Sequence, residues 1–206
     1  MALKTVLGKK IGMTRVFTPE GKAVAVSVVE IMPNTISQIK TLEKDGYNGV
    51  QVAYGQIKKP TKAIVGHLKK SGLKSSLKIA EFKTDETVNL KIGDRNTLDV
   101  FQEGDKVKVT AVSKGKGFAG TIKRWGFHRG PKTHGSNNIR QPGSIGSMFP
   151  QRVVKGRKMY GHLGARQASV LNLKIVKVNK ENNLLLISGA IPGPAKSIVK
   201  IQAVNH

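Results

Sequence analysis

Residues 105–112 read DKVKVTAV and residues 169–178 read SVLNLKIVKV. Polar and apolar side chains alternate in both stretches, as they do along a strand with one buried face. Between them lies a long segment of different composition, residues 113–166. Because a predicted strand stands on each side of this segment, we expect it to be an excursion from one folded body and not a terminal tail.

Working outward, the sequence predicts further short strands in residues 22–32, 35–42, 49–54, 77–82, 183–189 and 198–204. One helix is predicted over Thr61–Ser71, since Thr61 can cap its first turn and Gly72 can end it. Asn182 and Asn183 are expected to form a hairpin turn. Many short strands with few helices predict a mainly β fold built around a barrel.

The charge of the chain is large and unevenly distributed. Its 206 residues include 36 Lys and Arg against 12 Asp and Glu, which gives a formal net charge of +24. Residues 106–180 contain 17 of the basic side chains and no acidic one. A small domain needs a net charge of only about 2–8 to stay soluble. The much larger positive charge of this chain therefore predicts a polyanionic partner.

Several function classes are excluded by composition. The chain has no cysteine, so disulfides, cysteine-based zinc sites and thiol nucleophiles are ruled out. No run of 18 apolar residues occurs, which predicts that nothing spans a membrane. The first residues, MALKTVLGKKIGMT, lack the apolar core of a secretory signal.

The segment of residues 113–166 has the composition of a functional loop. Its 54 residues include 11 Gly and 12 Lys or Arg, and only residues 118–125 could form a short helix. Ordering such a segment costs about 1–2 kcal/mol per residue, which its few apolar side chains cannot offset. We therefore expect an external partner to order it. Phe118 and Trp125 would either pack onto the barrel or stack on unpaired bases, and the sequence leaves both open.

Three glycines of this segment match the G-x-G-x-x-G spacing of a nucleotide-binding turn: Gly115, Gly117 and Gly120. The rest of that site is missing, because no acidic residue follows about 20 positions later and no long helix can form before Gly126. The kinase and P-loop patterns also lack their partner motifs. The glycines are instead expected to let the backbone approach phosphate closely.

The other residues that could bind a metal or act in acid-base catalysis are expected to have simpler roles in hydrogen bonding, packing or turns. Three histidines stand at spacings of six and 28, which fit no helical metal pair, and we expect them to donate hydrogen bonds to RNA or to pack: His128, His134 and His162. Four acidic residues lie close in sequence and are expected in turns between strands: Asp94, Asp99, Glu103 and Asp105.

Several motifs, in order along the chain, resemble the large-subunit ribosomal protein L3 family in its bacterial form. They are LGKKIGMTRVF (residues 7–17), GYNGVQVAYG (46–55), AVSKGKGFAGTIKR (111–124), THG (133–135), PGSIG (142–146), VKGRKMYGHLG (154–164) and NLLLISGAIPG (183–193). The resemblance therefore extends over most of the chain.

The resemblance implies a mainly β fold: a six-stranded translation-protein-type β-barrel with a small α/β insertion and a long extended basic arm. On this chain the barrel would comprise residues 1–39, 91–112 and 167–206. The insertion would occupy residues 40–90. The arm would occupy residues 113–166, with its tip at about 143–152.

The resemblance also implies a function. The protein would be a non-enzymatic structural constituent of the large ribosomal subunit, cytoplasmic and without cofactor or metal. It would bind large-subunit (23S-type) rRNA, help to nucleate subunit assembly, contact neighbouring large-subunit proteins and support the peptidyl-transferase region with the arm tip. The alternative is a general, nucleoid-type nucleic-acid-binding protein.

The residues expected to contact RNA follow from these considerations. The basic, aromatic and polar candidates are Lys9, Lys10, Arg15, Lys114, Lys116, Lys123, Arg124, Trp125, Phe127, His128, Arg129, Lys132, His134, Arg140, Gln141, Arg152, Lys155, Arg157, Lys158, His162 and Arg166. The tip candidates are Gly143, Ser144, Ile145, Gly146, Ser147, Met148, Phe149, Pro150 and Gln151.

Two departures from the family pattern bear on these expectations. Lys108 stands where the family usually has Asp or Asn, which removes the last acid before the arm. The tip is one residue shorter than in many relatives, and the Gln that some relatives methylate falls on Met148 or Phe149. That modification is therefore not expected here.

Overall fold

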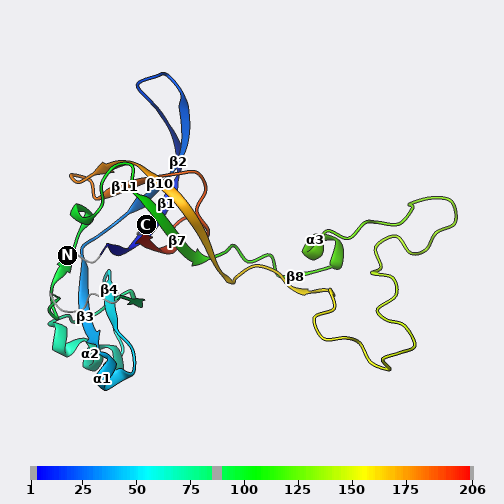
Figure 1. Ribbon diagram of the computed structural model, residues 1–206, viewed down its shortest axis with the longest axis horizontal. Coiled ribbons are helices and arrows are strands. Elements are labelled where there is room, and N and C mark those ends of the chain that lie inside the picture. Colours follow the sequence, from blue (N-terminus) through cyan, green and yellow to red (C-terminus); the bar gives the residue numbers. More distant parts are fainter. Residues whose placement is uncertain (1–3, 85–89, 205–206) are drawn as a thin grey trace. The chain divides into compact units, whose positions relative to one another are not determined.

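The computed structural model describes residues 4–84 and 90–204 and is built mainly of β-strands (Figure 1). The chain divides into two compact units. The first unit runs to Val112 and resumes at Gln167, and the second is Ser113–Arg166. Each unit is described by itself.

The first unit contains a closed six-stranded antiparallel barrel. Around the barrel the strands follow the order β1 (Thr5–Phe17), β12 (Ile198–Ala203), β7 (Lys106–Val112), β10 (Gln167–Asn179), β11 (Leu184–Ser188) and β2 (Ala23–Glu30). The predicted mainly β fold with a six-stranded barrel is thus confirmed.

Strand β1 was not among the strands predicted from alternation, because its sequence is rich in Gly and Lys. The glycine at position 8 has a steric reason: a Cβ atom there would lie 2.6 Å from the Val29 Cγ1 atom. Close approach of two strands, and not a hydrophobic pattern, therefore selects this residue.

The barrel interior is filled by branched aliphatic side chains. Val6, Val29, Val109, Ile187 and Ile201 are fully buried in one cluster. Val107, Val109 and Ala111 all belong to this cluster, so the alternation of DKVKVTAV marks the inward face of β7. Burial of this apolar area drives closure of the barrel.

A second sheet completes the first unit, with strand order β5 (Lys78–Lys83), β4 (Gly49–Tyr54), β3 (Asn34–Lys40) and β6 (Arg95–Asn96). Three short helical segments lie between its strands along the chain: α1 (Leu42–Asp45), α2 (Lys62–Leu68) and η1 (Lys69–Ser71). A fourth, η2 (Leu98–Val100), follows β6 and places Leu98 in the barrel cluster. The insertion was expected at residues 40–90, whereas this sheet also includes β6 and all of β3 except Lys40, which precede or follow those bounds.

Two buried asparagines account for this difference at the boundary. Asn34 accepts from the Leu7 N–H (2.8 Å) and donates to the Leu7 carbonyl (3.0 Å), so its amide binds β1 as a neighbouring strand would. Asn96 donates to the Thr5 carbonyl at 2.7 Å. The ends of β3 and β6 are thereby joined to β1 through side chains, which alternation cannot reveal.

Two local predictions are confirmed. Thr61 accepts a hydrogen bond from the Ile64 N–H at the start of α2, and Gly72 ends η1 with a left-handed φ of 71°. The turn between β10 and β11 contains Asn183, whose φ is also positive, at 53°. Residue type alone sets these features because the interactions are local.

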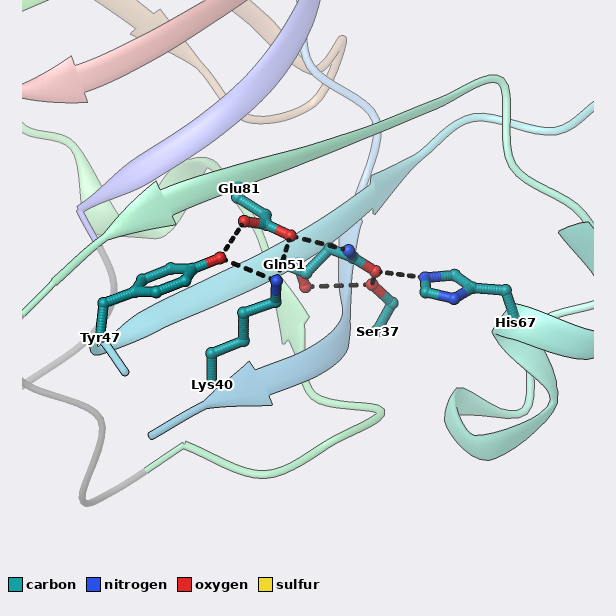
Figure 2. Close-up of polar contacts among 6 residues, drawn as sticks. All are labelled: Ser37, Lys40, Tyr47, Gln51, His67 and Glu81. Atoms are coloured by element: carbon teal, nitrogen blue, oxygen red, sulfur yellow. Dashed lines mark hydrogen bonds and ion pairs between the residues drawn. The ribbon is translucent and has the colours of Figure 1, made fainter. Parts of the chain in front are cut away.

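Six polar side chains form a network across the second sheet (Figure 2): Ser37, Lys40, Tyr47, Gln51, His67 and Glu81. The Tyr47 hydroxyl donates to Glu81 (2.7 Å) and accepts from Lys40 (2.7 Å), and Lys40 also pairs with Glu81 at 3.0 Å. His67 Nε2 donates to Gln51 Oε1 (2.6 Å), since an amide oxygen can only accept. The hydrogen bonds from Tyr47 and then Lys40 lower the pKa of Glu81.

Asn34→Ala is expected to destabilise the fold strongly. Loss of the amide leaves the buried N–H and C=O of Leu7 without these partners, at a cost of about 1–3 kcal/mol for each group. Urea denaturation measures the effect. Asn48→Ala is the matched control, because Asn48 caps only the Leu42 N–H at an exposed position, and an equal loss in both variants would contradict the proposed role of Asn34.

Glu81→Gln is expected to reduce the acid sensitivity of the fold. A carboxyl whose pKa is lowered by folding stabilises the protein above its unfolded pKa, and this contribution is lost as pH falls through the folded pKa. Between about pH 6 and about pH 3 the wild type should therefore lose more stability than Glu81→Gln. Urea midpoints across this window measure it, with Glu43→Gln on α1 as the control that should behave as wild type.

Candidate nucleic-acid interface

The second unit begins and ends in a short two-stranded ribbon. Strand β8 (Phe118–Ala119) pairs with β9 (Gly161–His162). Backbone hydrogen bonds join Ser113 to Arg166, and Leu163 to both Lys116 and Gly117, each at 2.9 Å. The outgoing and returning chains of the unit are therefore tied together over residues 113–119 and 161–166, which we call the root.

A short helix, α3 (Thr121–Trp125), is bound to the returning chain by one carbonyl group. Arg124 Nη1 and Trp125 Nε1 both donate to the Met159 carbonyl, at 2.7 and 2.8 Å. The cationic groups of Arg124 and Lys158 lie 5.0 and 5.9 Å from the centroid of the Trp125 ring. Residues 118–125 were the one part of this segment that could form a short helix, and the structure has a strand at 118–119 and a helix from Thr121.

The two aromatic residues left open by the sequence both contact the returning chain of their own unit. Phe118 lies against Tyr160, with ring centroids 5.6 Å apart, and Trp125 reaches Met159. Phe118 nevertheless remains 75% exposed and Trp125 43% exposed. Both rings thus keep surface on which a base could stack. Met159 was missed from the sequence, because a backbone carbonyl has no residue signature.

Glycines leave the backbone of the root open. A Cβ at Gly117 or Gly120 would meet no protein atom within 4 Å. At Gly115 the nearest atom would be the Ala165 Cβ at 3.6 Å, an ordinary contact. Gly164 differs, because its φ is +75° and a side chain there would overlap the Lys114 carbonyl. The G-x-G-x-x-G turn leads only into the five-residue helix α3, far shorter than a nucleotide-binding fold requires.

The predicted basic residues gather on the surface of this unit. The exposed cations are Lys114, Lys116, Lys123, Arg129, Lys132, Arg140, Arg152, Lys155, Arg157, Lys158 and Arg166. Arg124 is half-buried, and only Ala119 and Thr121 in the unit are buried. Since the unit contains no acidic residue, these cations cannot form ion pairs within it. Their charge is uncompensated until an anion binds.

The backbone of the tip accepts hydrogen bonds from Arg157 and from two serines of the tip itself. Arg157 donates to the Ser144 carbonyl at 2.7 Å, and the hydroxyls of Ser144 and Ser147 donate to the Gly146 and Phe149 carbonyls. Met148 and Phe149 are 90% and 84% exposed. The polar groups thus bind one another while the apolar side chains face outward, which is typical of a binding surface.

The remaining polar candidates also lie on this unit. His128, His134, His162 and Gln141 are exposed, and Phe127 is half-buried. Across residues 4–84 and 90–204 no group of three metal-ligating side chains occurs. Asp94 and Asp105 cap turns, accepting from the Lys91 N–H (2.9 Å) and the Gln102 N–H (3.0 Å), as the turn interpretation predicted.

Three predicted RNA contacts lie in the first unit instead. Lys9 is half-buried and Arg15 is exposed, both on β1. Lys10 is buried, and its ammonium donates to the Ile191 and Gly193 carbonyls at 2.9 and 3.1 Å. Lys10 thus fastens β1 to the chain before β12, and we do not include it in the interface.

Within the described part of the chain no helix is long and apolar enough to cross a membrane.

A β-barrel protein with a cationic, acid-free segment belongs to the class of proteins suited to polyanions. Comparison with known proteins specifies the class further. The family model described as ribosomal protein L3 matches residues 72–183. The large ribosomal subunit protein uL3 of Alkaliphilus metalliredigens (strain QYMF) is 48% identical over 203 residues, which cover 97% of each chain. The chain therefore belongs to the ribosomal protein L3 family and is a structural ribosomal protein, not an enzyme.

Gly164→Ala is expected to loosen the root without unfolding the barrel. Alanine at this positive φ costs about 1–2 kcal/mol, and its Cβ would push against the Lys114 carbonyl. The amides of Lys116 and Leu163 should then exchange hydrogen faster, as measured by amide exchange. Gly120→Ala is the control, since its Cβ enters open space. Unchanged protection in Gly164→Ala would contradict this account of the root.

Proposed function

We propose that this chain is a structural component of the large ribosomal subunit that binds large-subunit (23S-type) rRNA through residues 113–166. The observation that carries the proposal is the charge of this unit: 12 basic residues, 11 of them exposed, and no carboxylate. Phosphate neutralised by Lys and Arg releases counterions, which supplies most of the binding free energy. An acid-free surface loses none of that free energy to internal ion pairs.

The geometry of the unit supports RNA over other polyanions. Exposed aromatic faces at Phe118, Trp125 and Phe149 suit stacking on unpaired bases, which RNA offers in loops and bulges. The open backbone at Gly117 and Gly120 suits close approach of phosphate. The described residues contain no long exposed helix that could read a major groove.

Membership of the family supports three finer proposals. The tip, residues 143–152, would support the peptidyl-transferase region from outside the catalytic RNA, with Met148 and Phe149 as its outermost apolar groups. The protein would also help to nucleate subunit assembly and would contact neighbouring large-subunit proteins through its first unit.

Binding to a large-subunit rRNA fragment is expected to weaken steeply with salt. If about ten cations neutralise phosphates, log affinity falls against log salt with a slope near −7, at about −0.7 per contact. Replacing Lys114, Lys116, Lys123 and Lys132 by Ala should reduce the magnitude of the slope by about 3. Filter binding or fluorescence anisotropy over a salt series measures both.

The matched control replaces four exposed lysines of the first unit by Ala: Lys58, Lys59, Lys69 and Lys70. This variant has the same net charge as the arm variant, so an equal effect would assign binding to bulk charge. A slope near zero for the wild type would overturn the proposal. Equal affinity for duplex DNA would favour a general, nucleoid-type binder instead.

A further inference from the structure

The loop of residues 189–197, which we call the end loop, joins β11 to β12 and is bound to other strands of the barrel. At its start, Gly189 donates its N–H to the Ala25 carbonyl of β2 (2.8 Å) and accepts from the Ser27 hydroxyl (2.7 Å). Two residues further on, Ile191 is buried in the cluster that fills the barrel. The end loop is therefore a packed part of the barrel and not only a connection between two strands.

Lys10 of β1 holds the middle and the end of this loop. Its ammonium group donates to the Ile191 and Gly193 carbonyls, at 2.9 and 3.1 Å, and the residue is only 8% exposed. Its backbone binds the same loop, because its N–H donates to the Ser197 carbonyl (2.9 Å) and its carbonyl accepts from the Lys196 N–H (2.7 Å). Hydrogen bonds from an ionised donor are stronger than neutral ones, so the side chain adds a firm tie to the backbone pairing.

Gly193 brings the end loop against the last residue of β7. Its φ is +93°, and a Cβ there would lie 3.1 Å from the Val112 carbonyl oxygen and 2.5 Å from the Ser197 Oγ atom. Glycine alone makes this approach without displacing a neighbour. Because Val112 ends β7, residues 113–166 follow it directly. The end loop therefore packs against the residue from which the proposed RNA-binding segment leaves its strand.

The strand register shows why Val112 depends on the loop. β12 pairs with β7 only as far as Ala111, which lies opposite Val199. On the other side Val112 is still paired, opposite Gln167 of β10. Beyond the last β12 pair, the end loop thus takes the place of the strand: Lys10 binds it on the β1 side and Val112 contacts it on the β7 side.

We propose that Lys10 is a positioning residue for RNA binding, which acts through the end loop to fix Val112. Its ammonium makes no phosphate contact of its own, since it is buried and occupied by two carbonyls. A segment whose starting point is fixed loses less conformational freedom on binding, and it therefore binds more tightly. This inference rests on the proposed function, because it concerns the affinity of residues 113–166 for rRNA.

Two single variants and their combination test this role in the full chain. Lys10→Met removes the ammonium donor, and Gly193→Ala pushes the end loop away from Val112 while leaving Lys10 in place. Each should weaken binding to the large-subunit rRNA fragment by about fivefold, with an unchanged salt slope because the phosphate contacts are the same. The double variant should bind no more weakly than the weaker-binding single variant, since both changes act through one contact. Fluorescence anisotropy over the salt series measures affinity and slope, at a temperature where urea denaturation shows every variant to be folded.

Two controls separate positioning from loss of stability. Gly104→Ala introduces the same backbone strain (φ +92°) where a Cβ meets open space, and Asn34→Ala weakens the fold at the Leu7 end of β1; both should bind rRNA as the wild type does. An equal loss of affinity in either control, or wild-type affinity in Gly193→Ala, would overturn the role. A slope reduced in magnitude by about 0.7 in Lys10→Met would instead make Lys10 a direct phosphate contact. A slope near zero in the wild type would defeat the proposed function itself, which distinguishes the two failures.

Discussion

Antiparallel pairing of β7 with β10 is the constraint on which the rest of the structure depends. These strands are neighbours in the closed barrel, and their register brings Val112 opposite Gln167. The two ends of a 54-residue segment are thereby fixed side by side. Each doubling of a loop costs only about 0.6 kcal/mol more in closure entropy, so the barrel tolerates an excursion of this length. The barrel core supplies the stability, and the excursion remains available for binding.

Each unit is stabilised internally by a different kind of interaction. The barrel depends on buried aliphatic side chains such as Val109 and Ile201, whereas residues 113–166 bury only Ala119 and Thr121. The second unit relies on hydrogen bonds to carbonyls, above all those from Arg124 and Trp125 to Met159. Such bonds hold α3 to the returning chain but bury little area, so the cations and the apolar tip stay on the surface. A partner that supplies phosphates and bases would neutralise the cations of this unit and cover its exposed aromatic rings.

The first unit presents a different chemistry to its surroundings. Its basic residues are mixed with acidic ones, and several are occupied: Lys40 by Tyr47 and Glu81, and Lys10 by two carbonyls. Where β1 and β2 extend beyond the barrel, Met13 and Phe17 are exposed together with Arg15. The second unit thus presents cations without acidic partners of its own, whereas the surface of the first unit mixes both charges with exposed apolar side chains.

The sequence by itself determined the mainly β character, the cap at Thr61, the hairpin at Asn183 and the acid-free segment, because these depend on neighbours in the chain or on composition alone. Only the tertiary structure decided that β3 and β6 join the second sheet, that Lys10 is buried and that Trp125 binds Met159. The reason is distance along the chain: Asn34 meets Leu7 across 27 residues, Trp125 meets Met159 across 34, and Lys10 meets Ile191 across 181. Such partners are often backbone groups, which every residue carries, so no residue pattern can specify them in advance.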